Sequence, residues 1–182
     1  MNPEPLRVCI VAGGTGGHLF PGVAVARELS SRGHRIHFVV KKDLKTEQWL
    51  FGEKFPVTSF YCEGLPSRLS VRLIRFFFWM ALSSVHAFRF LRRERPHIVV
   101  GMGGYITFPL ALAALLRGIP LMLHEQNRMS GLANRVLSRW ASAVAVSFPG
   151  TAGLSTAAPV NRTGLPLRPE ILRPELAAEH EE

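Results

Sequence analysis

Near its amino terminus the chain reads Val8-Cys9-Ile10-Val11-Ala12-Gly13-Gly14-Thr15-Gly16-Gly17-His18. The first five of these residues form a continuous apolar run, which predicts a strand buried on both faces. The paired glycines end this strand, and a helical pattern follows from Gly22 onward. A strand, a glycine loop and a helix in this order predict the first unit of a parallel sheet.

The same alternation continues along the rest of the chain. Strands are predicted at residues 8–12, 36–40, 57–61, 98–100, 121–123 and 143–146. Helices are predicted between them at residues 22–31, 43–51, 69–93, 108–116 and 131–140. The sequence therefore predicts an α/β fold with a Rossmann-like, doubly wound parallel sheet.

Length and composition indicate a single domain. With 182 residues, 47% of them hydrophobic, the chain is long enough for one well-filled core and short for two. After Phe148 the sequence turns to small residues and proline, and then to a glutamate-rich end. We therefore expect a domain over residues 1–150 and a linker and tail over residues 151–182.

The charge favours an anionic partner. Lys and Arg number 22 against 13 Asp and Glu, which gives a net charge of +9. Acidic lipid and phosphorylated ligands fit; nucleic acid is disfavoured, because no recognition helix, zinc finger or aromatic RNA platform is recognisable. Cys9 and Cys62 lie in apolar runs without metal-ligand spacing, so we expect reduced core thiols, no metal and no cofactor.

The start of the chain predicts a cytoplasmic location. Residues 1–7 hold Glu4 and two prolines without a basic region, so no signal peptide is expected. The longest apolar candidate, residues 76–82, is far shorter than the roughly 20 residues of a membrane-spanning helix. Any membrane contact is therefore expected to be peripheral.

Residues 13–18 are a candidate phosphate site. They follow a strand and open a helix, so backbone amides can surround an anion at the positive end of the helix dipole. The loop is not a dinucleotide fingerprint, because its glycines are paired around Thr15 and Lys41 and Lys42 stand where an acidic residue is needed. A simple tight turn is the alternative interpretation.

Two more loops follow strands at the same predicted edge of the sheet. The glycine arrangement recurs in Gly101-Met102-Gly103-Gly104-Tyr105. The run His124-Glu125-Gln126-Asn127 places four polar side chains after a buried strand, which is costly unless they face a wet or ligand-filled crevice. General-base chemistry is open to three residues, His18, His124 and Glu125, and the sequence does not rank them.

The predicted helix at residues 69–93 has two apolar sides. One side is expected to pack on the sheet and consists of Leu69, Leu73, Phe77, Met80, Ala87 and Leu91. The other mixes cations with large apolar groups, at Arg72, Arg75, Trp79 and Leu82. Such a surface suits an anionic membrane, and coverage by another helix or subunit is the alternative.

Taken together, these loops resemble those of the MurG family. The resemblance rests on residues 13–18 with Phe20-Pro21-Gly22, residues 101–105, and residues 124–127 with Gly131, Leu132 and Asn134, and it runs from Arg7 to about Arg168. It implies the N-terminal domain of a two-domain GT-B glycosyltransferase, without the second, donor domain.

Members of the MurG family transfer N-acetylglucosamine from UDP-N-acetylglucosamine to undecaprenyl-diphosphate-muramoyl-pentapeptide, with inversion, at the cytoplasmic side of the cell membrane. The resemblance therefore implies peptidoglycan synthesis, and with it cell wall biogenesis, cell shape and cell division. It also leaves two hypotheses. The chain is part of the transferase and needs a separate donor domain, or it is a non-catalytic, membrane-docked module that holds the acceptor.

The resemblance assigns roles residue by residue. The implied base is His18, and Glu125 is an acceptor-side residue and second catalytic candidate. The implied donor contacts are Thr15, Gly16, Gly17, Asn127 and Arg168. The implied acceptor contacts are Gly14, Gly103, Gly104, Tyr105 and Asn134. The family's closing Gly-Asn-Pro-x-Arg is here Gly164-Leu165-Pro166-Leu167-Arg168, so leucine replaces the asparagine.

Overall fold

The computed structural model describes residues 4–13, 15–66, 71–168 and 171. Its strands are β1 (Arg7–Ala12), β2 (Arg35–Lys41), β3 (Val57–Phe60), β4 (Ile98–Gly101), β5 (Leu121–Glu125), β6 (Ala143–Val146) and β7 (Val160–Arg162). Its helices are α1 (Gly16–Ser31), α2 (Leu44–Trp49), α3 (Val71–Glu94), α4 (Thr107–Leu116) and α5 (Leu132–Leu137), with a 3-10 turn η1 (Ser138–Trp140).

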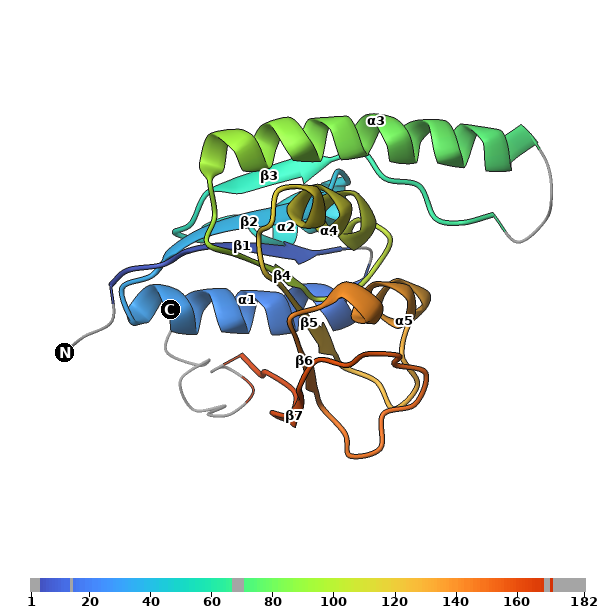
Figure 1. Ribbon diagram of the computed structural model, residues 1–182. Helices are drawn as coiled ribbons and strands as arrows, with labels where there is room; N and C mark the ends of the chain where they lie inside the picture. Colours follow the sequence, from blue (N-terminus) through green and yellow to red (C-terminus); the bar gives the residue numbers. More distant parts are fainter. Residues whose placement is uncertain (1–3, 14, 67–70, 169–170, 172–182) are drawn as a thin grey trace.

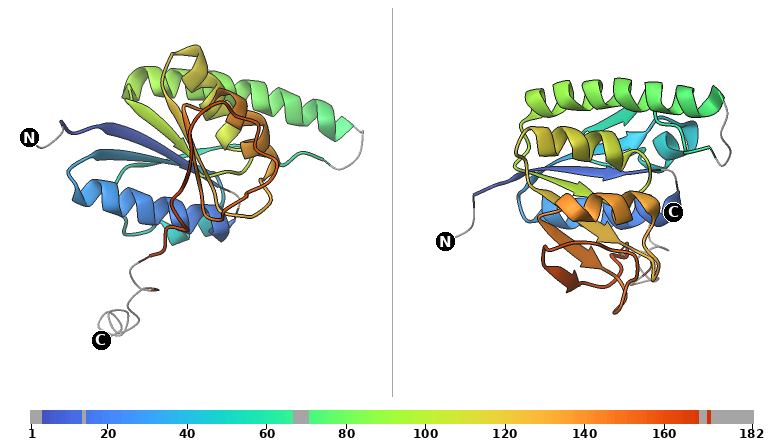
Figure 2. Two further views of the ribbon diagram at one scale, coloured as in Figure 1. Left: turned by 60° about the horizontal axis from the view of Figure 1, so that its bottom comes forward. Right: turned by 45° about the vertical axis from the view of Figure 1, so that its right-hand side comes forward.

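The strands form one parallel sheet in the order β3-β2-β1-β4-β5-β6-β7. Helix α1 covers one face, and α3 and α4 cover the other (Figures 1 and 2). The order reverses direction between β1 and β4, which is the switch point where α/β sheets bind ligands. The predicted Rossmann-like, doubly wound fold is confirmed.

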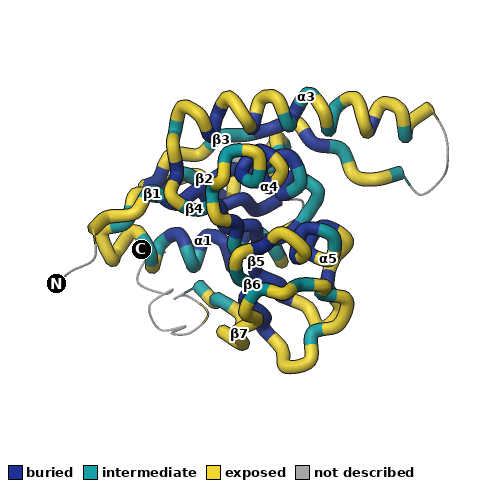
Figure 3. The backbone as a smooth tube through the Cα atoms, viewed as in Figure 1, coloured by how far each residue is buried: buried dark blue, intermediate teal, exposed yellow. Residues whose placement is uncertain are grey.

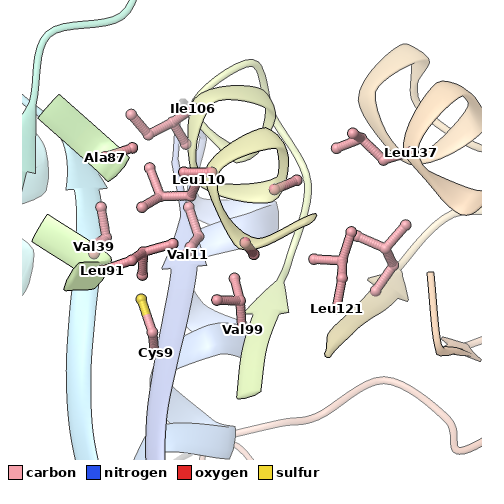
Figure 4. Close-up of a cluster of buried hydrophobic side chains, with 14 of the residues drawn as sticks. Cys9, Val11, Val39, Ala87, Leu91, Val99, Ile106, Leu110, Leu121 and Leu137 are labelled. Carbon is pink, nitrogen blue, oxygen red and sulfur yellow. The ribbon is translucent and has the colours of Figure 1, made fainter. Parts of the chain in front are cut away.

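Alternate residues of the central strands enter two separate cores. Cys9 and Val11 point toward α3 and α4, where they pack with Leu91 and Leu110 (Figure 4). Their neighbours on β1, Val8 and Ile10, join the core beneath α1. This alternation makes β1 apolar throughout, as the sequence pattern predicted. Both cysteines are buried, as expected.

Two boundaries differ from the predictions. Helix α1 begins at Gly16 rather than Gly22, so Pro21 lies inside the helix, where it has no N–H to donate. Glycine and proline disfavour a helix interior, which is why the sequence pattern placed the start later. Strand β7 lies inside the predicted linker and pairs with β6 in register Val144 to Val160. All three β7 residues are exposed, so only backbone hydrogen bonds hold the strand and no apolar pattern marks it.

Helix α3 packs with part of the predicted side, since Leu73 and Met80 are half-buried. Its buried residues are Phe76, Ser83, Ala87, Phe90 and Leu91, so Ala87 and Leu91 are confirmed. Phe77 is 59% exposed, which corrects its assignment to the core, and Leu69 falls outside the described residues. Figure 3 shows buried and exposed residues alternating along α3. The buried residues lie on one side of the helix, which leaves Phe77 toward its edge and exposed.

The length of α3 also revises the expectation that no apolar segment is long enough to span a membrane. Within the described ranges, α3 is the one helix long and apolar enough to cross a membrane by length and composition, although the longest apolar run alone is too short. Only 17% of the most apolar 18-residue segment of α3 is buried in the domain. Length and composition are weak grounds for a span, since exposed interfacial helices have the same properties.

Candidate functional site

The three predicted loops meet at the carboxyl edge of β1, β4 and β5. The two glycine loops touch: a Cβ at Gly104 would lie 2.8 Å from the carbonyl oxygen of Gly13. Gly103 and Gly104 have φ of +103° and +82°, a region that favours glycine. The close approach and the backbone conformation together require glycine here.

His18, in the first turns of α1, lies against the second glycine loop. A Cβ at Gly103 would be 2.9 Å from its Cε1 atom, so the imidazole occupies the space that glycine leaves free. Its Nδ1 atom is 2.9 Å from Oε1 of Gln126, at the end of β5. Side chains from two of the three loops are therefore joined by a direct hydrogen bond.

Gln126 and His124 continue this network into the domain, and both are buried. The Nε2 atom of Gln126 lies 2.9 Å from the carbonyl oxygen of Met102 and 3.1 Å from Nδ1 of His124. Nε2 of His124 lies 3.2 Å from the carbonyl oxygen of Gly164. Burial lowers the pKa of His124, which favours its neutral form at neutral pH.

Glu125 is 1% exposed and its carboxylate accepts four hydrogen bonds. Oε1 accepts from the backbone and side-chain amides of Asn127 at 3.0 and 3.2 Å. Oε2 accepts from the Gly131 amide at 3.0 Å and from Nδ2 of Asn134 at 2.9 Å. These bonds occupy both oxygens, so the carboxylate fixes the loop between β5 and α5.

The assigned donor and acceptor residues fall into exposed and buried groups. Thr15 and Gly17 at the start of α1 are exposed, Gly16 is half-buried, and Asn127 is exposed with its Nδ2 held by Glu125. Asn134 is fully buried and also donates to the carbonyl oxygen of His124 at 3.0 Å, so it supports the loop from inside. Gly14 lies outside the described residues.

Arg168 comes back to the first glycine loop. Its guanidinium stacks over the ring of Phe20 at 4.0 Å from the centroid, beside the opening turn of α1. Phe20 in turn lies so close to Gly16 that a Cβ there would be 2.9 Å from the ring. The segment after β7 thus places a cation near Thr15 and Gly16, although leucine replaces the family's asparagine.

A small polar cleft opens in front of His18. The glycine-loop cleft has a volume of about 230 Å³ and is lined by residues that include Gly13, Thr15, His18, Lys41, Glu63, Gly104 and Tyr105. Lys41 was not singled out as a site residue from the sequence, and its position at the carboxyl end of β2 is the signal that could have identified it. A basic residue at this edge suits an anionic ligand.

Next to this cleft lies a wide apolar groove. It has a volume of about 630 Å³ between α3, α4 and α5, and its lining includes Phe76, Phe77, Met80, Leu112, Leu116, Leu132 and Trp140. Tyr105 lines both the glycine-loop cleft and the apolar groove, and its ring packs edge-on against Phe76 at 6.1 Å. A ligand with a charged head and an apolar chain could occupy both at once.

The residues predicted for a membrane face differ in exposure and in their contacts. Trp79 is half-buried and packs on Tyr61 at 4.6 Å between ring centroids, and Leu82 is half-buried. Arg72 is exposed, and Arg75 pairs with Glu63 at 3.1 Å. The exposed apolar side of α3 consists instead of Val71, Ile74, Phe77, Phe78, Val85 and Phe88.

Within the described residues there is no group of three or more His, Cys, Asp or Glu that could hold a metal ion. Burial raises the pKa of the Cys62 thiol to about 11, although Cys62 lines the glycine-loop cleft. At neutral pH such a thiol stays protonated and is a poor nucleophile.

A parallel sheet with paired glycine loops at its switch point defines the chain as a Rossmann-like ligand-binding domain. Residues 8–146 match the glycosyltransferase family 28 N-terminal domain. The chain belongs to this family.

Individual relatives agree with the match. The chain is 40% identical over 170 residues to a UDP-N-acetylglucosamine--N-acetylmuramyl-(pentapeptide) pyrophosphoryl-undecaprenol N-acetylglucosamine transferase of Ectopseudomonas mendocina, covering 91% of the chain and 46% of the relative. The transferase of the same name from Ralstonia nicotianae is 42% identical over 153 residues, 80% of the chain and 40% of the relative.

A solved structure, that of MurG from Acinetobacter baumannii, superposes with a TM-score of 0.75 at 32% identity, over 86% of the chain and 46% of MurG. The resemblance to the MurG family and the GT-B fold are therefore confirmed. The chain spans about half the length of the curated relatives it matches.

Proposed function

We propose that this chain is the acceptor-side half of an inverting transferase that moves N-acetylglucosamine from UDP-N-acetylglucosamine to undecaprenyl-diphosphate-muramoyl-pentapeptide, a step of peptidoglycan synthesis. The observation that carries the proposal is the placement of His18. Its imidazole lies at the meeting point of the two glycine loops and faces a cleft that continues, past Tyr105, into the apolar groove. Cell wall biogenesis, cell shape and cell division depend on such a step.

The arrangement suits the chemistry of an inverting transfer. The glycine loops, together with Lys41, would bind the acceptor diphosphate through backbone amides and positive charge. His18 would take the proton of the acceptor hydroxyl while its oxygen attacks the anomeric carbon, and UDP would leave with the bonding electron pair. Thr15, Gly16, Gly17, Asn127 and Arg168 would form one wall of the donor site.

Glu125 and Asn134 have a supporting part in this proposal. Both oxygens of Glu125 are occupied by N–H donors, and Asn134 is buried beneath the loop. We therefore assign general-base chemistry to His18 and loop positioning to Glu125. This assignment places His18 before Glu125 among the candidate bases that the sequence left open.

We also propose that the chain docks peripherally on an anionic membrane surface at the cytoplasmic side. The exposed apolar side of α3 and the apolar groove would enter the interface, with Arg72, Arg75 and Arg89 near the headgroups. A spanning α3 is disfavoured because Ala87 and Leu91 are fully buried in the core and would have to leave it.

A second candidate function is an acceptor-holding module without activity of its own. It is favoured by the lining of the glycine-loop cleft and the apolar groove, since residues of this domain line both and Tyr105 is shared between them. A separate donor-domain partner would then supply the second wall of the cleft.

One experiment separates these functions. UDP release from UDP-N-acetylglucosamine would be measured with a lipid-linked muramoyl-pentapeptide analogue, first with this chain alone and then with a separately expressed donor domain of a relative. Release by the mixture, lost in His18→Gln, supports the transferase. Acceptor binding without release in either case favours the holding module, and absence of both binding and release contradicts both functions.

A further inference from the structure

A neutral imidazole has one N–H and one nitrogen with a free lone pair, and only the latter can take a proton. Which nitrogen of His18 is free depends on its hydrogen-bond partner. That partner is Oε1 of Gln126, 2.9 Å from Nδ1 of His18. An amide offers either an acceptor or a donor, so the orientation of the Gln126 amide decides the tautomer of His18.

The surroundings of Gln126 fix that orientation. Its Nε2 atom lies 2.9 Å from the carbonyl oxygen of Met102, an atom that can only accept. The amide nitrogen must therefore point toward Met102, and the amide oxygen toward His18. Because the oxygen only accepts, Nδ1 of His18 must carry the hydrogen, which leaves the lone pair on Nε2.

The hydrogen bonds of His124 lead independently to the same orientation of the Gln126 amide. The carbonyl oxygen of Gly164 only accepts, so Nε2 of His124 carries the hydrogen and donates across 3.2 Å. Nδ1 of the neutral His124 then accepts from the second N–H of Gln126 at 3.1 Å. The carbonyl oxygen of His124, 3.3 Å from Nε2 of Gln126, also only accepts, so all three neighbours require the amide nitrogen here and leave the amide oxygen of Gln126 toward His18.

We propose that Gln126 is a positioning residue that holds His18 in the Nδ1–H tautomer and so presents Nε2 as the proton acceptor. Gln126 is buried and His18 is held between Gly103 and Gln126, so the imidazole cannot turn over without breaking this bond. The assignment of Nε2 as the reacting atom rests on the proposed function, whereas the tautomer of His18 does not.

The tautomer can be measured on the chain itself, without any transfer reaction. Two-dimensional NMR of ¹⁵N-labelled histidine side chains distinguishes a protonated from an unprotonated ring nitrogen, and His18→Gln identifies the His18 signals. The wild-type chain is expected to show Nδ1 protonated and Nε2 unprotonated. A His18 that carries its proton on Nε2 overturns the proposal.

Variants of Gln126 give a second test. Gln126→Met keeps the volume but removes the acceptor, so His18 should exchange between both tautomers. Gln126→Glu keeps an acceptor oxygen toward Nδ1, so the Nδ1–H tautomer should persist. This variant is the control for a loss of folding in Gln126→Met. Gln48→Met, at an exposed position of α2, is the matched control. A His18 tautomer unchanged in Gln126→Met contradicts the proposal.

The consequence for transfer is tested with the donor domain present. Gln126→Met is expected to lower kcat by about 100-fold with little change in the KM for the acceptor, because general-base catalysis and not binding is affected. A change in KM alone would show a purely structural role. If no mixture transfers the sugar, the proposed function fails, while the NMR result still decides the role of Gln126.

Discussion

Gly104 occupies a position in which any side chain is strained. Its φ is +82°, and an added Cβ would lie 2.8 Å from the Gly13 carbonyl oxygen. We expect Gly104→Ala to lower the free energy of unfolding by about 1–3 kcal/mol, measured by urea denaturation. Gly33 has a similar φ of +86° with open space around it among the described atoms, so Gly33→Ala isolates the backbone cost. Equal losses in both variants would show that contact between the glycine loops contributes nothing.

Glu125 illustrates a buried charge that supports a loop. Its four N–H donors all point at carboxylate oxygens, and Glu125→Gln would turn an amide NH₂ group toward some of them. We expect this variant to lose on the order of 2–4 kcal/mol of stability by urea denaturation. Glu28→Gln, on the surface of α1, is the control. Unchanged stability with lost transfer would instead support a catalytic Glu125.

At the scale of elements, the two sides of α3 lie in different surroundings. The buried side, with Phe76, Ala87 and Leu91, holds the helix on the sheet and on α4. The opposite side leaves Ile74, Phe78 and Val85 exposed at helical spacing. A helix whose outer side is this apolar needs a further contact, and the surrounding arginines favour an anionic one.

Docking on a membrane through α3, as proposed, should depend on its arginines. Arg72→Glu with Arg75→Glu should weaken binding to anionic vesicles by at least about 30-fold in cosedimentation, because each basic residue near such a surface contributes on the order of 1 kcal/mol. The charge-matched control is Arg32→Glu with Arg35→Glu, beside the far end of α1. Binding unchanged by the α3 substitutions would contradict docking through α3.

At the scale of the whole molecule, buried histidines couple stability to pH. Burial lowers the pKa of His37 and of His124 below the ordinary 6.5, although Glu94 opposes this effect at His37. Above pH 6.5 both imidazoles are neutral, folded or unfolded. As the pH falls through 6.5, the unfolded chain takes up protons that the folded chain does not, so the free energy of unfolding decreases.

We therefore expect urea denaturation to show falling stability from about pH 7.5 to about pH 5.5. A second loss should begin near pH 4.5, because the pKa values of Glu63 and Glu94 lie below that ordinary value in the fold. His37→Gln should flatten the first step, with His86→Gln, at an exposed position of α3, as control. A flat profile above pH 5.5 would contradict a role for the buried imidazoles.

The sequence by itself determined the class of fold and the edge of the sheet at which the three loops meet. Apolar runs in β1 and β5 identified buried parallel strands, because burial on both faces removes polar residues from a strand. Glycine pairs in residues 13–17 and 103–104 and the polar run of residues 124–127 marked this edge, because the backbone and hydrogen-bond demands there admit few residue types. These signals are local, so they can be seen without coordinates.

Tertiary structure decided the rest, because each remaining feature depends on contacts between distant segments. Strand β7 exists through backbone pairing with β6, which leaves no apolar pattern. The outward side of α3 depends on its rotation against α4, and helical spacing alone allowed Phe77 either way. The roles of Glu125 and Gln126 depend on which atoms face which donors and acceptors, and that pairing joins residues up to 108 positions apart.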